Sequence, residues 1–417
     1  MKKNFGEKRL NQSLGFLFIA GLIIIAALTA PCSAQRKSYS VLYSFQGTPD
    51  GQDPTGPLLY VSGKLYGTTS VGGMWGHGTV FELNALGNES VLFSFKRRVP
   101  DGLLPNPRLI EGTDGALYGT TSAGGAYDGG VIFRLDRNDK ETLLHSFGDG
   151  TDGYAPYAGV IRDKAGNLYG TTQGGGLFGE HCNYLGCGTV YEMNPNGYES
   201  VLYGFTGGAD GGDPFAGLIL GPDGDLFGAT YGGGNTQACD LGCGTIFELD
   251  KTGKETALHA FDVSDGANPN NVVVDKMGNL YGTTAQGGCH GLGTVFEFDK
   301  AGKFKIVHCF AGGRNDGSAA GYLLLGPGAV LYGTAALGGG GPCYLRSGKR
   351  VGCGIVFKLD KRGKETILHR FQAGTDGVSP YGLAIDAEGN LYGIASAGGD
   401  INCNAPYGCG LVFKIKP

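Results

Sequence analysis

The stretch LYGTTSVGGMWGHGTVFEL, residues 65–83, decides the fold of this chain. It contains two short phrases rich in β-branched and aromatic residues, LYGTT and GTVFEL, which a glycine-rich loop separates. Runs of this composition, bounded by Gly, Asn, Asp or Pro, are typical of β-strands. The stretch therefore predicts two strands joined by a loop.

This unit recurs seven times along the chain. The aromatic residue of its first phrase falls at Tyr66, Tyr118, Tyr169, Phe227, Tyr281, Tyr332 and Tyr392. Two further phrases complete each repeat: an apolar run such as PYAGVIRD (156–163) precedes LYGT, and a phrase such as ETLLHSF (141–147) follows GTVFEL. We call these four predicted strands a, b, c and d in chain order. Four hairpin-linked strands that recur in this order along the chain predict one blade of a β-propeller per repeat.

The two ends of the repeat region complete each other. The repeats begin with an isolated d strand at residues 39–45 and end with a c strand at residues 410–415. Pairing these strands would close a ring and leave no open sheet edge. We therefore predict an all-β fold, a seven-bladed β-propeller of four-stranded antiparallel blades, in a single domain over residues 35–417.

Composition agrees with this fold and excludes several classes of protein. Gly accounts for 81 of 417 residues, but no Gly-X-Y register runs along the chain, which excludes collagen. With 41% hydrophobic residues the chain is not a disordered one. The net charge is -5, and no basic block lies outside the N-terminus, so we expect no nucleic-acid partner.

The LYGTT…GG…GTVFEL units resemble a known family, the GloVer (Gloeobacter/Verrucomicrobia-type) tandem-repeat exported proteins, a choice-of-anchor repeat family. The resemblance covers residues 39–417. It implies an exported, β-propeller-like protein and no established activity. Many members carry a C-terminal sorting or anchoring segment, whereas this sequence ends with a strand and Pro417, which argues against such an attachment.

Residues 1–34 are predicted to be a signal peptide. Lys2, Lys3, Lys8 and Arg9 precede an apolar run from Leu14 to Ala30, and Cys32-Ser33-Ala34 offers small residues for cleavage before Gln35. The alternatives are a retained membrane anchor and a lipoprotein signal at Cys32, although Pro31 is a poor residue before a lipidated cysteine. We expect a secreted or periplasmic protein without a membrane span after cleavage.

The ten cysteines after Cys32 predict disulfides, since their number is even and the chain is expected to be exported. Four pairs lie within single b–c loops, and a fifth pair would join the b–c loop and the d strand of repeat 5. The expected pairs are Cys182 with Cys187, Cys239 with Cys243, Cys343 with Cys353, Cys403 with Cys409, and Cys289 with Cys309. A zinc site is the alternative, but no two CxxC knuckles occur.

Four histidines recur at one position of strand d, namely His145, His259, His308 and His369. The other repeats place Tyr43, Phe93 and Tyr203 there. A position that accepts any flat ring predicts packing between blades rather than catalysis or metal binding, and we assign no metal ligands.

An Asp-Gly pair occurs in every d–a connection. Its aspartates are Asp50, Asp101, Asp152, Asp210, Asp265, Asp316 and Asp376. At the mouth of a propeller channel they could coordinate calcium or bind sugar hydroxyls. The alternative is structural, because Asp-Gly is a preferred turn pair and a carboxylate accepts local N–H bonds. Together with Trp75 of a b–c loop, these aspartates are the candidate ligand-binding residues.

The sequence thus predicts a binding module, with a glycan or protein ligand at the loop face, rather than an enzyme. The alternative is a lyase or hydrolase that uses carboxylates at the channel mouth on a polysaccharide or small molecule. No HExxH motif, P-loop or nucleophile elbow is present. We expect no cofactor, calcium apart, and a monomeric protein.

Overall fold

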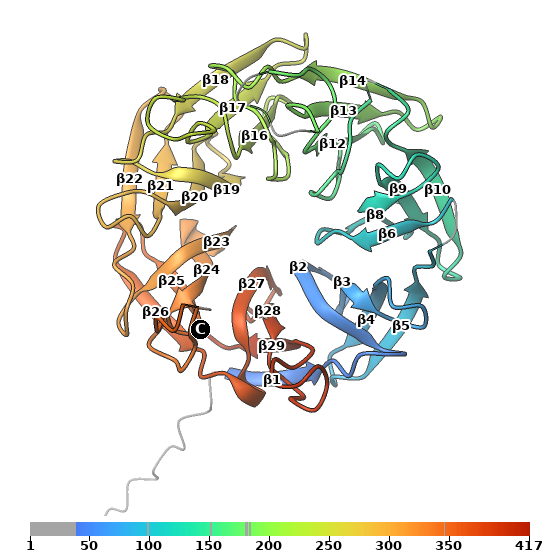
Figure 1. The fold of residues 1–417 in the computed structure, drawn as a ribbon, viewed down its shortest axis with the longest axis vertical. Coiled ribbons are helices and arrows are strands. Elements are labelled where there is room, and N and C mark those ends of the chain that lie inside the picture. Colours follow the sequence, from blue (N-terminus) through green and yellow to red (C-terminus); the bar gives the residue numbers. More distant parts are fainter. Residues whose placement is uncertain (1–38, 98–99, 151, 180–181, 183–184, 346) are drawn as a thin grey trace, which may run out of the picture. The chain divides into compact units, whose positions relative to one another are not determined.

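A computed structural model of the chain describes residues 39–97, 100–150, 152–179, 182, 185–345 and 347–417. The predicted signal peptide and Cys32 lie outside the described residues. Seven antiparallel sheets are arranged in a ring, so the predicted seven-bladed propeller is confirmed (Figure 1). No helix among the described residues is both long and apolar enough to cross a membrane.

Each blade holds the four predicted strands in the order a-b-c-d from the channel outward. The a strands are β2 (Gly51–Val61), β6 (Gly102–Pro105) with β7 (Ile110–Glu111), β11 (Ile161–Arg162), β15 (Ile219–Leu220), β19 (Ala267–Val274), β23 (Gly317–Leu325) and β27 (Val378–Ile385). The b strands are β3 (Lys64–Gly72), β8 (Leu117–Gly124), β12 (Leu168–Thr172), β16 (Leu226–Thr230), β20 (Leu280–Gln286), β24 (Leu331–Gly338) and β28 (Leu391–Ala397).

The c and d strands form the outer half of each blade. The c strands are β4 (Thr79–Asn84), β9 (Val131–Leu135), β13 (Thr189–Met193), β17 (Thr245–Leu249), β21 (Thr294–Phe298), β25 (Ile355–Leu359) and β29 (Leu411–Ile415). The d strands are β5 (Glu89–Ser94), β10 (Glu141–Ser146), β14 (Glu199–Gly204), β18 (Glu255–Ala260), β22 (Phe304–Cys309), β26 (Glu365–Arg370) and β1 (Tyr39–Ser44). Two short 3₁₀ turns, η1 (Pro327–Ala329) and η2 (Gly374–Asp376), interrupt the connections.

The ring closes as predicted, because β1 pairs antiparallel with β29. Tyr39 lies opposite Ile415, and Ser44 lies opposite Leu411. The first described strand thereby becomes the d strand of the last blade. We number the blades 1 to 7 in chain order, from the blade that begins with β2 to the blade that begins with β27.

The glycine of each LYG phrase makes room for an aromatic ring on the neighbouring c strand. Gly67 lies opposite Phe81, and a Cβ added to it would stand 2.5 Å from the tip of that ring. The ring in turn packs edge-on against a phenylalanine of the preceding blade, as Phe81 does against Phe45 at 5.1 Å. Both rings are fully buried. The core is therefore a series of clusters between blades.

The a strands vary widely in length. β2 has 11 residues, whereas β11 and β15 have two each. A left-handed residue followed by proline, as in Ala155-Pro156, precedes the short strands, and proline has no N–H to give to the ladder. In β2 the pairing resumes beyond this break, with a shift of register between Thr55 and Leu59.

All five predicted disulfides are present in the structure. Four of them close b–c loops, and the fifth joins a b–c loop to β22. They are Cys182–Cys187, Cys239–Cys243, Cys343–Cys353, Cys403–Cys409 and Cys289–Cys309. Bonds of this kind persist in oxidising environments, which suggests an exported protein.

The second cysteine of each loop disulfide belongs to the core. These residues are Cys187, Cys243, Cys353 and Cys409, and each is fully buried in a cluster between blades. The glycine after each of them has a φ between 86° and 104° and turns the chain into the c strand. Because the cysteine stands where the loop enters the blade, its sulfur contacts the core. The four disulfides therefore tie the loops to the core.

Candidate functional site: the central channel

A ring of left-handed residues surrounds one end of the channel. Each blade has one non-glycine residue with φ between 51° and 58° near the start of its a strand. They are Asp53, Leu104, Ala155, Asp213, Asn268, Ala319 and Ser379. This conformation costs an L-residue roughly 1–2 kcal/mol. Backbone strain of this kind concentrates at functional sites, and here all seven blades carry it at the channel.

The b–c loop of the preceding blade holds each of these residues in place. In four blades the N–H of the left-handed residue donates to the carbonyl of the buried cysteine of a loop disulfide. The four pairs are Asp213 with Cys187, Asn268 with Cys243, Ser379 with Cys353 and Asp53 with Cys409, at 2.8–3.1 Å. The disulfides therefore stabilise the loops that position the channel residues.

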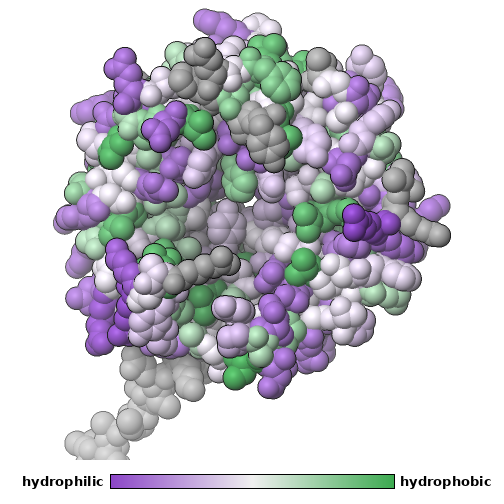
Figure 2. All heavy atoms as spheres, in the orientation of Figure 1, coloured by the Kyte–Doolittle hydropathy of each residue, from purple (hydrophilic) through white to green (hydrophobic). Residues whose placement is uncertain are grey.

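The channel contains a cavity of about 450 Å³ just beyond this ring. Its wall includes Tyr157, Phe215 and Tyr381, together with the side chains of Ser70 and Ser396. These residues come from four blades, and they meet because the a and b strands converge on the ring axis (Figure 1). In the space-filling view the face turned to the reader is hollowed at its centre (Figure 2).

Aromatic side chains line opposite parts of this cavity. Tyr157 and Phe215 stack with their ring centroids 5.0 Å apart, and Phe215 is 42% exposed although it is a large apolar residue. Across the channel, the ring centroid of Tyr381 lies 6.3 Å from that of Tyr322 of the preceding blade. Exposed aromatic faces beside hydroxyl groups are a surface on which a flat or cyclic ligand can stack.

Farther along the a strands the cavity narrows around one charged side chain. Arg108 lines this inner part with Asn270, Asn271 and the same tyrosines. Its Nη1 atom donates a long hydrogen bond of 3.4 Å to the carbonyl of Leu218. Among the described residues, no carboxylate forms an ion pair with Arg108. The guanidinium of Arg108 in the channel therefore has N–H donors that can bind a ligand.

The Asp-Gly aspartates, which the sequence singled out, bond to the outer strands. Six carboxylates contact the ring of the preceding d strand, in the pairs Tyr43–Asp50, His145–Asp152, Tyr203–Asp210, His259–Asp265, His308–Asp316 and His369–Asp376, at 2.9–3.4 Å. Phe93 takes the ring position beside Asp101. The carboxylates also accept N–H bonds from their own connections, as Asp210 does from Thr206. This geometry favours the structural interpretation, and a ligand role stays a prediction.

Neighbouring blades meet at seven junctions, each with one of these rings and one of these aspartates. At every junction the first residue of the next blade's d strand packs against them. At five junctions it is a glutamate, namely Glu89, Glu141, Glu199, Glu255 or Glu365, and burial, with a contribution from a nearby aspartate, raises the pKa of each to about 7. At the other two, Phe304 stacks on His259 and Tyr39 stacks on His369, with centroids 3.9 and 3.7 Å apart. The histidines therefore pack between blades, as predicted.

Trp75 lies in a separate groove, at the outer part of the junction between blades 7 and 1. The groove has a volume of about 510 Å³, and Asp50, Met74, Glu89 and Lys96 also line it. Lys96 stands 5.5 Å from the centre of the Trp75 ring, which is half exposed. Of the candidate residues from the sequence, Trp75 and Asp50 line this groove together.

The sequence profile of the Gloeobacter/Verrucomicrobia repeat matches residues 31–182 and 141–345. The chain belongs to this repeat family. No curated protein sequence matches this Gloeobacter/Verrucomicrobia repeat protein.

Solved structures similar to the repeat protein are other propellers. A virginiamycin B lyase from Staphylococcus aureus shares 12% identity and has a TM-score of 0.58, with 91% of this chain and 99% of that chain covered. A puromycin hydrolase shares 12% (TM-score 0.54; 84% and 50% covered), and a puromycin-hydrolyzing peptidase from Mycobacterium tuberculosis shares 13% (TM-score 0.50; 82% and 50% covered). At these identities the likeness shows the fold alone.

Sequence reasoning missed the channel residues of the repeat protein. Tyr157, Phe215 and Tyr381 each follow the proline of an a strand, where Thr55 and Asn106 stand in other blades. The signal was present in this variation, because the repeats keep the proline in six blades and change the residue after it. The sequence alone did not show that this position faces the channel.

Proposed function

We propose that this protein is an exported binding module whose central channel takes a glycan that carries a carboxylate. One observation carries the proposal: the channel wall combines stacked aromatic residues, serine hydroxyls and an arginine that has no carboxylate partner among the described residues. Export itself rests on the predicted signal peptide, and the five disulfides are consistent with it.

The size of the channel cavity and the aromatic residues in its wall support a sugar ligand. A volume of about 450 Å³ falls within the range of small-ligand pockets. Sugar rings present apolar faces that stack on aromatic side chains, and their hydroxyls bond to groups such as Ser70, Ser396 and Asn270. A protein ligand on the loop face would instead contact the exposed loop aromatics, such as Trp75 and Tyr127.

The charge of the inner cavity supports an acidic ligand. Arg108 presents a planar fork of donors, and its hydrogen bond to Leu218 occupies only one nitrogen of that fork. A carboxylate can accept two parallel hydrogen bonds from such a fork. The channel wall offers no competing carboxylate among its lining residues.

Calorimetric titration with trigalacturonate and with its methyl ester tests the proposal on the oxidised protein. We expect the acid to bind about tenfold more tightly than the ester, because only the acid pairs with Arg108. Arg108→Gln should remove this preference, and Tyr381→Ala should weaken binding of both. Trp75→Ala and Tyr127→Ala are matched aromatic controls outside the channel and should change neither.

Two outcomes would contradict the channel proposal. Failure of the wild-type protein to bind either oligosaccharide would overturn it. Loss of binding in Trp75→Ala, with Tyr381→Ala unaffected, would move the site to the loop face and favour the outer groove.

An enzyme acting at the channel mouth is the second candidate, and Asp53 is the observation that favours it. This left-handed residue precedes Pro54 of the cavity wall, and burial raises the pKa of its carboxyl above the ordinary value. A carboxyl of this kind can act as a general acid. Product release from trigalacturonate that disappears in Asp53→Asn would support catalysis, and binding without turnover would exclude it for this substrate.

A further inference from the structure

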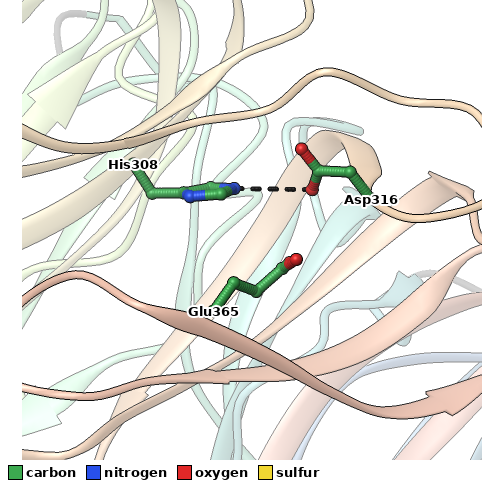
Figure 3. Close-up of side chains that lie close together, drawn as sticks. All are labelled: His308, Asp316 and Glu365. Atoms are coloured by element: carbon green, nitrogen blue, oxygen red, sulfur yellow. Dashed lines mark hydrogen bonds and ion pairs between the residues drawn. The ribbon is translucent and has the colours of Figure 1, made fainter.

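We propose that the junction between blades 5 and 6 binds one zinc ion through His308, Asp316 and Glu365. These residues come from the end of β22, the connection before β23, and the start of β26. One ligand atom from each lies within 4.8 Å of the other two. Figure 3 shows the Glu365 carboxylate beside the line that joins the imidazole to Asp316.

The spacing of the first two ligands differs from that at the other junctions. His308 Nε2 and Asp316 Oδ1 are 3.4 Å apart, whereas the other three histidines lie 2.9–3.1 Å from their aspartates. The shorter distances are those of ordinary hydrogen bonds. Zinc bonds of about 2.0–2.2 Å in a tetrahedral site separate two ligand atoms by roughly 3.4 Å.

Glu365 supplies the third ligand. Its Oε1 atom is shielded from solvent and accepts no hydrogen bond. The Glu365 carboxylate, the Asp316 carboxylate and the His308 imidazole each bring one ligand atom to this junction. Three protein ligands would leave a fourth position for water.

The ligand types select zinc rather than calcium. Imidazole is a ligand for zinc and similar metals, whereas calcium takes six to eight oxygen atoms. Cys309 follows His308 directly, but its sulfur is bonded to Cys289 and is not available to a metal. Apart from this junction and the one that holds His145, five junctions lack either the histidine or the glutamate. Tyr203 replaces the histidine at one of them, and Phe304 replaces the glutamate at another.

Blades 2 and 3 provide a matched control within the same molecule. His145, Asp152 and Glu199 repeat the three residue types at their junction. His145 lies at hydrogen-bond distance from Asp152, 3.0 Å away. The described residues hold no second His/Cys/Asp/Glu cluster as compact as that at His308.

Zinc titration of the oxidised full-length protein, without reductant, tests the site. We expect about one Zn²⁺ per chain. His308→Tyr should weaken binding at least about tenfold and leave the zinc-free Tm nearly unchanged, because Tyr43 and Tyr203 already bond to their aspartates in the same position. Glu365→Gln should weaken zinc binding similarly, while the double variant His145→Tyr/Glu199→Gln should bind zinc within about twofold of the wild type.

The outcomes separate this site from adventitious binding. Absence of zinc binding by the wild type would overturn the proposal, as would binding that survives His308→Tyr, which would indicate surface histidines such as His77 or His290. Binding of Ca²⁺ in preference to Zn²⁺ would overturn it as well. None of these results depends on the channel ligand.

Discussion

At the residue scale, buried glutamates share the space between neighbouring blades. Glu255 illustrates the five: burial first, and then the charge of Asp210, raises its pKa from the ordinary 4.5 to about 7. Its Oε1 atom accepts no hydrogen bond and is shielded from solvent. Such a group favours the protonated form in the folded protein. The folded blades therefore hold protons at pH values where the unfolded chain has released them.

We expect Glu255→Gln to stabilise the protein at alkaline pH only. The stabilising contribution of the protonated glutamate is fully present below pH 4.5 and is lost as the pH rises through about 7. Gln keeps the neutral form at every pH. The Tm of Glu255→Gln should therefore exceed that of the wild type at pH 8.5 and match it at pH 4.5. Glu388→Gln, at an exposed site, is the control, and a larger gain at pH 4.5 would contradict the assignment.

At the scale of single elements, each a strand has a strained left-handed residue at or near its start. Ala319 has a φ of 53°, whereas the next residue, Ala320, is fully buried and lies in the β23–β24 ladder opposite Ala335. Glycine adopts the left-handed conformation without steric cost, but it weakens a regular strand. The same substitution should thus have opposite effects at two adjacent positions.

Ala319→Gly should raise the free energy of unfolding by about 0.5 kcal/mol, and Ala320→Gly should lower it by about 1 kcal/mol. Urea unfolding of both variants measures the difference. Equal losses of stability in the two variants would show that the left-handed residue is not strained.

Local sequence patterns predicted most of the strands. They could not predict which residues of different blades lie close together. Gly67 and Phe81 lie within one repeat, so their phrases were enough to predict both strands. Tyr157 and Tyr381 are far apart in the chain and line one cavity only because the ring curves. The spacing of Cys239 and Cys243 likewise predicted their bond, but the burial of Cys243 and Cys409 depends on the neighbouring blade, which no local pattern describes.

At the scale of the whole molecule, one strand pair holds the ring shut. β1 covers the edge of β29, and Phe45 of the same segment is fully buried against Phe81 of the first blade. An uncovered c strand would present unpaired backbone groups, which invite pairing with another chain. Residues 39–45 thus serve both the last blade and the first.

Deletion of residues 39–45 should destabilise the ring by more than the about 3–5 kcal/mol that truncating one buried phenylalanine costs. It should also produce larger species in size-exclusion chromatography, through the exposed edge of β29. The matched control moves the same residues to the other end, after Pro417 and a short Gly-Ser linker. Because Tyr39 lies opposite Ile415, this permuted chain can form a hairpin and should recover the wild-type Tm and size. Failure of that rescue would contradict closure as the cause.

The pairing of β1 with β29 also determines the order in which the blades can form during synthesis. A ribosome makes residues 39–44 before any blade exists and makes residues 411–415 after the strands of the first six blades. Blades 1 to 6 each draw their strands from one continuous stretch, so they can form in succession, whereas the seventh can form only after β29 has been made. Until β29 has been made, β1 has no partner strand and the ring stays open.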